Sequence, residues 1–290
     1  MSKIKVSIII VFYSGAENIY QCLTSIKESK PKTLYEVIII DNSEKKEIKE
    51  KINKEFPWVK YIESENKGYG AGNNLGASYA LGKYLFILNP DTVLFKGSLD
   101  TLVTFLDKRE NVAIVAPNLL DENGKIFPQM GSKMLTPIRG IVGHSFLNRI
   151  FPNNPISQEY WLKDIPLTVL READAVPGSA FLIRKDIFEK VGAFDENMFL
   201  FFEESDLGKR IREAGYQIFI NPKAEVKHRW TLPKESSQKI KNYFKESRFY
   251  YFKKHYGIYW ALVVEAFTRF SKWHVFIILC TLLALYAFLR

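Results

Sequence analysis

The fold is decided by the stretch Asn-Lys-Gly-Tyr-Gly-Ala-Gly-Asn-Asn-Leu-Gly at residues 66–76 and by Leu-Asn-Pro-Asp-Thr at residues 88–92. Between them lie a helix-like segment that runs to Leu81 and the apolar run Tyr84–Leu88. Glycines ahead of a helix let the backbone approach a ligand and leave amides free to meet an anion. An apolar strand that ends in a carboxylate presents it at the carboxyl edge of a sheet, where open α/β folds bind their ligands. We therefore expect the functional site at this edge.

Neither part of this stretch is specific by itself. The spacing Gly68-x-Gly70-x-Gly72 differs from the G-x-G-x-x-G of a dinucleotide site, which argues against a dinucleotide-dependent oxidoreductase. Asp91 follows a proline and could equally be an ordinary turn aspartate. Residues elsewhere in the chain are needed to distinguish a ligand site at Asp91 from an ordinary turn.

The first part of the chain predicts an α/β fold. Val6–Phe12 and Val37–Ile40 are apolar, β-branched runs typical of strands buried on both faces, and a helical pattern separates them. Two such strands joined by a helix form a parallel βαβ unit. Further predicted elements are strands at 59–62 and 112–116, a helix at 98–106 capped by Ser98, and a turn at Asn123-Gly124.

The region 128–170 is rich in proline and shows little periodicity. We interpret it as an irregular insertion over the acceptor side of the site, where a lid or acceptor specificity commonly lies. A surface loop of no functional consequence is an equally open alternative. After this region the pattern predicts a strand ending at Arg184, a helix at 185–191, and short strands at 218–220 and 224–227.

Three carboxylates, Glu203, Glu204 and Asp206, begin another predicted helix. Negative charge is favoured in the first turn of a helix, and Asp206 could simply pair with Arg210 four residues on. Because the apolar run Phe199-Leu-Phe-Phe leads into the cluster, we favour general-base or metal chemistry over a solvated face.

The net charge of +9 is concentrated late in the chain, where lysines and arginines alternate with aromatic residues. Because an apolar run at Trp273–Leu289 follows, this pattern favours an anionic membrane surface over nucleic acid. At 1.5 Å per residue the run falls slightly short of the roughly 30 Å hydrocarbon core. We expect Tyr256–Phe270 to lie in the interface, and we leave open whether the tail spans the membrane, lies in it, or forms a buried helix or an oligomer contact. The two cysteines are far apart in sequence, and no signal peptide is visible, which indicates a reducing compartment.

Seven motifs, in order along residues 4–230, resemble those of the family 2 glycosyltransferases of GT-A fold, and most of all the bacterial rhamnosyltransferases. They are Val-Ser-Ile-Ile-Ile-Val-Phe-Tyr at 6–13, Ile-Asp-Asn-Ser at 40–43, the glycine stretch at 66–76, Leu-Asn-Pro-Asp at 88–91, Gly-Ser-Ala-Phe-Leu-Ile-Arg at 178–184, Gly-Ala-Phe-Asp-Glu at 192–196, and Phe-Glu-Glu-Ser-Asp-Leu-Gly-Lys-Arg-Ile-Arg-Glu-Ala-Gly-Tyr at 202–216. An ordered set of motifs is far more specific than any one of them.

The resemblance implies a Rossmann-like mixed sheet flanked by helices in a catalytic domain at 1–232, followed by a membrane-associated segment at 233–290. It implies inverting transfer from a nucleotide-diphosphate sugar, which we expect to be dTDP-rhamnose, to a polyprenyl-diphosphate-linked saccharide. The setting would be cell-surface polysaccharide synthesis at the cytoplasmic face of the membrane. The alternatives are another donor (UDP-galactofuranose, UDP-hexose or GDP-hexose) or a non-catalytic nucleotide-sugar-binding subunit. A homo-oligomer remains open.

The resemblance also implies roles for single residues. Asp91 and His228 would hold Mg²⁺ or Mn²⁺, and Asp41 would hydrogen-bond the donor's base. Glu204 would be the catalytic base, with Glu203 the alternative and Asp206 a support or acceptor contact. The full set expected to bind the nucleotide sugar is Phe12, Tyr13, Asp41, Asn66, Gly68, Gly70, Asn73, Asn89 and Asp91.

Two departures from the family pattern bear on these roles. The metal motif, usually Asp-x-Asp, reads Asn89-Pro90-Asp91, so one side chain of the motif is neutral. The base motif usually has Glu-Asp where this chain has Glu203-Glu204, which places a longer side chain at the base position. Acids nevertheless remain at both the metal and the base positions, which favours an enzyme over a non-catalytic subunit.

Overall fold

The computed structural model of the chain describes residues 3–128, 130–145, 147–229 and 237–269. Its strands are β1 (Val6–Phe12), β2 (Tyr35–Asp41), β3 (Val59–Glu63), β4 (Tyr84–Leu88), β5 (Thr92–Leu94), β6 (Val112–Leu120), β7 (Arg171–Ala173), β8 (Ala180–Arg184) and β9 (Gln217–His228). Its helices are α1 (Ala16–Ser29), α2 (Lys49–Glu55), α3 (Tyr69–Ser78), α4 (Ser98–Asp107), α5 (Pro137–His144), α6 (Leu147–Ile150), α7 (Pro155–Tyr160), α8 (Lys185–Lys190), α9 (Glu203–Glu213) and α10 (Ser237–Arg269).

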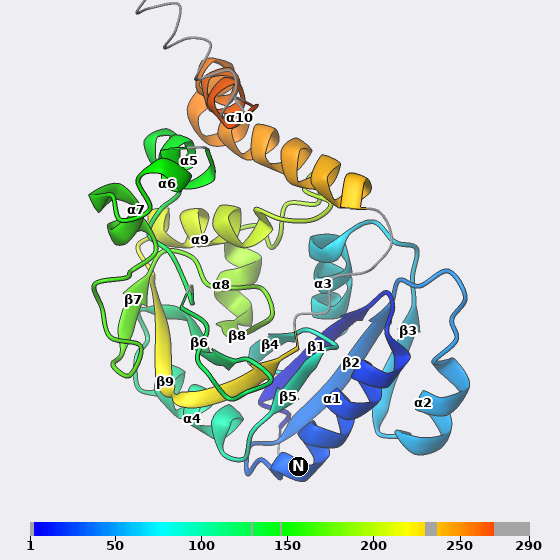
Figure 1. The fold of residues 1–290 in the computed structure, drawn as a ribbon. Helices are drawn as coiled ribbons and strands as arrows, with labels where there is room; N and C mark the ends of the chain where they lie inside the picture. Colours follow the sequence, from blue (N-terminus) through cyan, green and yellow to red (C-terminus); the bar gives the residue numbers. More distant parts are fainter. Residues whose placement is uncertain (1–2, 129, 146, 230–236, 270–290) are drawn as a thin grey trace, which may run out of the picture.

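The strands form one mixed sheet in the order β3-β2-β1-β4-β8-β6-β9-β5, with β7 also paired to β9. β1, β2, β3 and β4 run parallel, which confirms the βαβ units expected from the sequence. β8 runs antiparallel between β4 and β6. Helices α1, α2 and α4 lie along one side of the sheet, and α3, α8 and α9 along the other (Figure 1). Because parallel strands are covered on both faces, β1, β2 and β4 consist of buried apolar residues over most of their length.

A second, smaller core lies above this sheet and joins three segments that are distant in sequence. Leu135 and Tyr160 come from the 128–170 region, Met198 and Phe202 precede α9, and Tyr251 and Phe252 belong to α10. The Tyr251 hydroxyl donates a hydrogen bond of 3.0 Å to the Leu135 carbonyl. The described part of the 128–170 region contains α5, α6 and α7 with irregular segments around them, and it packs against α10 (Figure 1). That it faces an acceptor stays a prediction.

Three further sequence predictions are corrected by the structure. Ser98 does not cap α4: Gly97 is the cap residue, and the Ser98 hydroxyl instead donates to the Glu225 carbonyl on β9. The two short strands expected at 218–220 and 224–227 form one strand, β9, whose pairing with β6 shifts register between Pro117 and Asn118. The glycines of the 66–76 stretch do not precede a helix, since α3 begins at Tyr69 and contains all of them except Gly68.

Helix α10 has a kink at Gly257, whose φ of 86° is left-handed. Among the residues that the structure describes, none of the helices combines the length and the apolar character needed to cross a membrane. The apolar run Trp273–Leu289 lies outside the described residues.

Candidate active site

Asp91 and His228 meet because two strands pair at the edge of the sheet. Thr92, the first residue of β5, lies opposite His228, the last residue of β9. The Asp91 Oδ1 and His228 Nε2 atoms are 3.2 Å apart, and both side chains are largely buried, with exposed fractions of 12% and 8%. The two residues that sequence resemblance assigned to a metal are thus neighbours in space.

The Asp91–His228 pair fits a divalent cation as two of its ligands. Mg²⁺ and Mn²⁺ prefer oxygen donors such as the Asp91 carboxylate, and an imidazole such as that of His228 suits Mn²⁺ better than the harder Mg²⁺. Adjacent ligands in an octahedral shell lie about 3 Å from each other. Within the described parts of the chain, no cluster of three or more His, Cys, Asp or Glu side chains is arranged to hold a metal. A cation here would therefore take its remaining ligands from water and from a bound substrate, as Mg²⁺ commonly does beside phosphates.

Asp41 ends β2 and is fully buried. Its Oδ1 accepts a hydrogen bond of 2.8 Å from the Ser43 amide, and its Oδ2 accepts one from the Tyr61 hydroxyl. Lys46 Nζ donates to the Asp41 carbonyl at 2.5 Å. The carboxylate is therefore held in one orientation, and a hydrogen bond to a nucleotide base would have to use its remaining lone pairs.

Three buried polar atoms beside Asp41 have no hydrogen-bond partner among the described residues: Asn42 Oδ1, Ser43 Oγ and Asn73 Oδ1. Unsatisfied buried polar atoms are costly in a folded protein and often meet a ligand or ordered water. Asn42 and Ser43 were not predicted as site residues, although their position directly after a buried strand was a usable signal. Asn73 was predicted to bind the nucleotide sugar, and its Nδ2 donates to the Tyr69 carbonyl at 3.0 Å.

The glycines of α3 have a packing role that the sequence did not indicate. A methyl group added to Gly76 would overlap Ile9 of β1, and one added to Gly72 would overlap Val11, so both let α3 lie directly on the sheet. Gly68 has a φ of 107°, and a side chain there would overlap the Phe199 carbonyl. Gly70 packs against Phe194. Close packing explains these glycines by itself, and contact of Gly68 or Gly70 with a nucleotide sugar stays a prediction.

The remaining residues predicted to bind nucleotide differ in exposure. Phe12 is fully buried, so only its backbone could meet a ligand, whereas Tyr13 directly after it is 47% exposed. Asn66 is exposed, and its Oδ1 accepts a hydrogen bond of 3.2 Å from the Gly68 amide. Asn89 follows β4, and its amide donates to the Ser179 carbonyl at 2.9 Å. Tyr13, Asn66 and Asn89 thus lie in loops that follow β1, β3 and β4.

Glu204 is brought to this edge by Gly178. The Gly178 amide is hydrogen-bonded to the Glu204 carboxylate, and a methyl group added to Gly178 would overlap that carboxylate. The Tyr69 hydroxyl, at the start of α3, donates to the Gly178 carbonyl at 2.5 Å. Because Ser179 is bonded to Asn89 of the metal motif, Glu204 and Asp91 belong to neighbouring parts of the same edge.

Among the described residues, neither Glu203 nor Glu204 forms an ion pair of the kind that usually accompanies a buried acid. Burial raises the pKa of Glu203 well above its usual range, and the Glu204 carboxylate raises it further. Burial likewise raises the pKa of Glu204, opposed in part by backbone hydrogen bonds. Glu203 is 1% exposed and its Oε2 has no hydrogen-bond partner among the described residues, whereas Glu204 is partly exposed. A partly exposed carboxylate with a raised pKa suits general-base catalysis near neutral pH, which favours Glu204 over Glu203.

The segment that delivers these acids has an unusual backbone. Phe201 and Phe202 have φ angles of 72° and 68°, in the left-handed region that bulky residues rarely adopt. Each such residue costs on the order of 1–3 kcal/mol. Strained residues of this kind concentrate at functional sites, and here they immediately precede Glu203.

Asp206 was expected to support the base or to contact the acceptor. Its side chain is fully buried and pairs with Arg210 at 2.6 Å, Lys254 Nζ at 2.6 Å and His255 Nε2 at 2.7 Å. These partners lower the pKa of Asp206 to about 2, with the His255 hydrogen bond as the largest favourable contribution. The i,i+4 pair with Arg210 is confirmed, and the carboxylate joins α9 to α10, whereas a contact with an acceptor stays a prediction.

The chain has relatives among known proteins in both sequence and fold. The profile of the family described as "Glycosyl transferase family 2" matches residues 7–192. The N-acetylglucosaminyl-diphospho-decaprenol L-rhamnosyltransferase of Mycobacterium tuberculosis (strain H37Rv) is 27% identical over 233 residues, which cover 76% of this chain and 75% of that protein. Rhamnosyltransferase WbbL of Escherichia coli (strain K12) is 24% identical over 237 residues, covering 77% and 83%.

A solved structure of GalNAc-T7 with UDP, GalNAc and Mn²⁺ superposes with a TM-score of 0.61 at 20% identity. The superposition covers 87% of this chain but only 50% of that one, so the chain spans about half of the solved protein. At this identity the likeness concerns the fold alone, and it supports the predicted GT-A arrangement of a mixed sheet flanked by helices.

Proposed function

This chain belongs to glycosyl transferase family 2, and from that membership we propose that it is an inverting, divalent-metal-dependent enzyme that moves rhamnose from dTDP-rhamnose to a polyprenyl-diphosphate-linked saccharide. That it is a rhamnosyltransferase-like transferase follows from the family and from its relatives. The donor, the metal and the stereochemistry are the parts we propose. The acceptor class is proposed from the M. tuberculosis relative, whose name specifies a diphospho-decaprenol acceptor.

One observation carries the proposed chemistry: a partly exposed carboxylate, Glu204, lies against Gly178 at the sheet edge that also holds Asp91 and His228. Inverting transfer needs a base for the acceptor hydroxyl and positive charge at the leaving diphosphate. Glu204 would serve as the base, and Asp91 with His228 would hold the positive charge, so different residues meet the two requirements.

In the proposed reaction, the acceptor hydroxyl attacks the anomeric carbon on the face opposite the diphosphate. The new carbon–oxygen bond forms while the bond to the diphosphate breaks, so the electron pair leaves on the phosphate oxygen and the configuration inverts. Glu204 accepts the proton of the attacking hydroxyl. Asp91 and His228 would hold Mg²⁺ or Mn²⁺, which stabilises the charge on the leaving diphosphate when bound. Asn42 and Ser43, with their unsatisfied oxygens, would meet donor groups of the nucleotide.

Association with the cytoplasmic face of the membrane is a further part of the proposal. Beyond its kink, α10 exposes apolar side chains, with exposed fractions of 52% for Ile258, 71% for Tyr259 and 57% for Leu262. Exposed apolar residues grouped on one helix suit a helix that lies in a membrane interface. Replacing Tyr259 and Leu262 with glutamate should reduce co-sedimentation with phosphatidylglycerol vesicles while donor binding is kept. Unchanged co-sedimentation would contradict this surface.

A nucleotide-sugar screen tests the proposed donor and metal. The purified protein is heated with dTDP-rhamnose, UDP-galactofuranose, a UDP-hexose or a GDP-hexose, each with and without Mn²⁺, and hydrolysis of each donor is measured. We expect the largest thermal stabilisation from dTDP-rhamnose, and only with the metal. A preference for a UDP or GDP donor would contradict the assigned donor alone, whereas equal binding and activity without metal would contradict the metal site.

The alternative of a non-catalytic nucleotide-sugar-binding subunit predicts stabilisation in that screen without hydrolysis or transfer. The buried acids Glu203 and Glu204, whose pKa values are raised and which form no ion pair among the described residues, argue against it, because a purely structural role would be served better by neutral side chains.

A further inference from the structure

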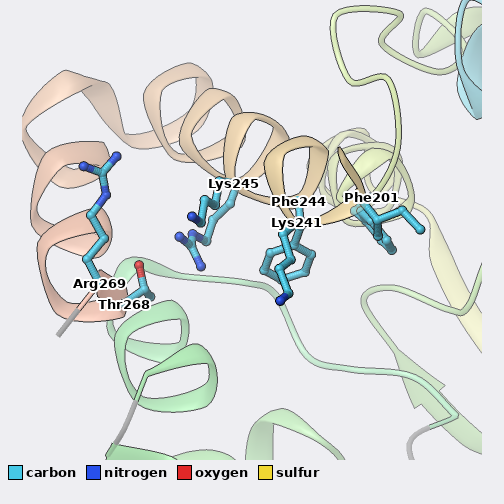
Figure 2. A pocket seen from close by; sticks show the side chains of 8 residues that line it. Phe201, Lys241, Phe244, Lys245, Thr268 and Arg269 are labelled. Atoms are coloured by element: carbon cyan, nitrogen blue, oxygen red, sulfur yellow. The ribbon is translucent and has the colours of Figure 1, made fainter. Parts of the chain in front are cut away.

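A cavity of about 440 Å³ lies in the angle between the two halves of α10, away from the sheet edge. Figure 2 shows Lys241, Phe244 and Lys245 on the first half of the helix, with Thr268 and Arg269 on the second half across the space. Phe201, from the segment before α9, closes one end. The residues lining the cavity are Phe201, Ile240, Lys241, Phe244, Lys245, Arg248, Thr268 and Arg269.

The lining combines positive charge with apolar surface. It contains the cations Lys241, Lys245, Arg248 and Arg269, and no carboxylate is among the described residues that line it. Arg248 is almost completely buried and is fixed by Glu265, with 2.7 Å between Arg248 Nε and Glu265 Oε1. Arg269 Nε lies 3.4 Å from the other oxygen of Glu265, so one carboxylate serves both arginines and the exposed Lys241 and Lys245 keep their charge available. Lysine ammonium groups beside a guanidinium can bind phosphate groups.

A ligand with charged groups alone would not match the apolar part of the lining. Phe201, Phe244 and Ile240 form a surface that a chain of hydrocarbon would cover and that free phosphate would leave in water. A ligand that suits both parts carries phosphate at one end and an apolar chain at the other.

The cavity is also connected to the candidate base. Phe201 is three residues before Glu204, so their Cα atoms are at most about 11 Å apart. The strained residues Phe201 and Phe202 form this short link between the cavity and the first turn of α9. The distance along the chain between a residue that lines the cavity and the candidate base is therefore short.

We propose that this cavity, the α10 pocket, binds the diphosphate and the first apolar units of the acceptor's lipid carrier. The inference rests on the proposed function and adds the place where the acceptor is recognised. The positive groups of the α10 pocket hold the diphosphate, and the attached saccharide extends toward the sheet edge. Recognition of the carrier is thereby separate from recognition of the donor nucleotide.

A binding experiment tests the α10 pocket without relying on turnover. A short-chain prenyl diphosphate, the matching prenyl alcohol and inorganic diphosphate are each titrated against the full chain. We expect the prenyl diphosphate to bind at least tenfold more tightly than either of the others. In the double variant Lys241→Gln/Lys245→Gln, this affinity should fall about tenfold or more, since losing a charged contact costs on that scale.

The matched control is Lys239→Gln/Lys253→Gln, which removes the same charge from exposed positions of α10 outside the pocket. It should leave prenyl diphosphate binding unchanged. Donor binding should be unchanged in both double variants. If both double variants bound prenyl diphosphate equally weakly, net charge alone would explain the loss, and the proposed pocket would be wrong. Equal affinity of the wild type for the prenyl diphosphate and the prenyl alcohol would also contradict the pocket.

A second arm separates the carrier from the bilayer. Binding of both double variants to phosphatidylglycerol vesicles without carrier is measured first. Transfer is then measured on two acceptors with the same saccharide, one attached to a prenyl diphosphate and the other to a neutral alkyl group. In Lys241→Gln/Lys245→Gln, the pocket variant, we expect the KM for the acceptor with the prenyl diphosphate to rise and the KM for the acceptor with the neutral alkyl group to stay unchanged. Loss of vesicle binding confined to the pocket variant would assign the pocket to phospholipid headgroups instead and overturn the proposal. Tight prenyl diphosphate binding by a wild-type chain that transfers no sugar would contradict the proposed function but not the pocket.

Discussion

The first turn of helix α9 holds carboxylates in opposite electrostatic surroundings. Burial raises the pKa of Glu203 and Glu204, which form no ion pair within the described part of the chain. On the side facing α10, Arg210, Lys254 and His255 lower the pKa of Asp206 to about 2. The first pair is ready to take up a proton, and the second site is a permanent charge that fixes one helix to another. Acids within four residues of each other thus have separate functions because of what the fold places beside them.

The largest expected effect comes from an acid that lies outside α9. Asp91→Ala should abolish transfer, by at least a thousandfold, and should remove most metal-dependent binding of the donor. Isothermal titration of the donor with and without Mn²⁺ measures the binding. If Glu204→Gln lost donor affinity to the same extent, the glutamates would belong to the metal site and the contrast between base and metal would fail.

Asp206→Asn tests the structural side of α9. The substitution leaves Arg210 and Lys254 without their buried counter-charge, and breaking such a network costs about 3 kcal/mol. Chemical denaturation should show this loss of unfolding free energy. The isosteric Glu204→Gln is the control on the other side of the helix. An Asp206→Asn protein that is as stable as the wild type would show that the ionic link to α10 contributes nothing.

The pH dependence of that stability sharpens the contrast. The pKa of Asp206 is about 2 in the folded chain and about 3.9 in an unfolded one, so its contribution is complete above pH 4 and is lost as the pH falls toward 2. The wild type should lose about 2–3 kcal/mol more than Asp206→Asn over this range. Parallel loss in both proteins would contradict the lowered pKa.

Glu203→Gln should have the smallest effect on the free energy of unfolding, and it should stabilise the fold where Asp206→Asn destabilises it. Because its pKa is raised, ionised Glu203 destabilises the fold, and this cost is absent below the unfolded pKa and grows as the pH rises toward the folded pKa. The variant should therefore be more stable than the wild type by about 0.5–2 kcal/mol at pH 8, with a smaller gain at pH 4. Thermal unfolding at the two pH values measures the difference, and destabilisation at pH 8 would contradict it.

The local sequence pattern predicts the central strands correctly, but it does not predict contacts between segments that are distant in sequence. The predicted bounds of β1 and β4 are confirmed to the residue, because continuous apolar runs with polar ends define a buried strand. The partners of Asp206 could not be predicted, since Lys254 and His255 are 48 and 49 residues away and belong to a helix whose docking depends on packing. The same holds for Ser98, whose hydroxyl bonds Glu225 on another element. The glycines of α3 were assigned to a ligand because a sequence does not show that a helix will lie on β1.

The central claim is that Glu204 accepts the proton of the acceptor while the donor is held elsewhere. The direct test is single-turnover transfer by Glu204→Gln with saturating donor, acceptor and Mg²⁺, measured beside the dissociation constant of the donor. We predict that the rate of transfer falls by about 10²–10⁴-fold while donor affinity changes less than twofold. Transfer at the wild-type rate, or a larger loss in Glu203→Gln than in Glu204→Gln, would contradict the assignment.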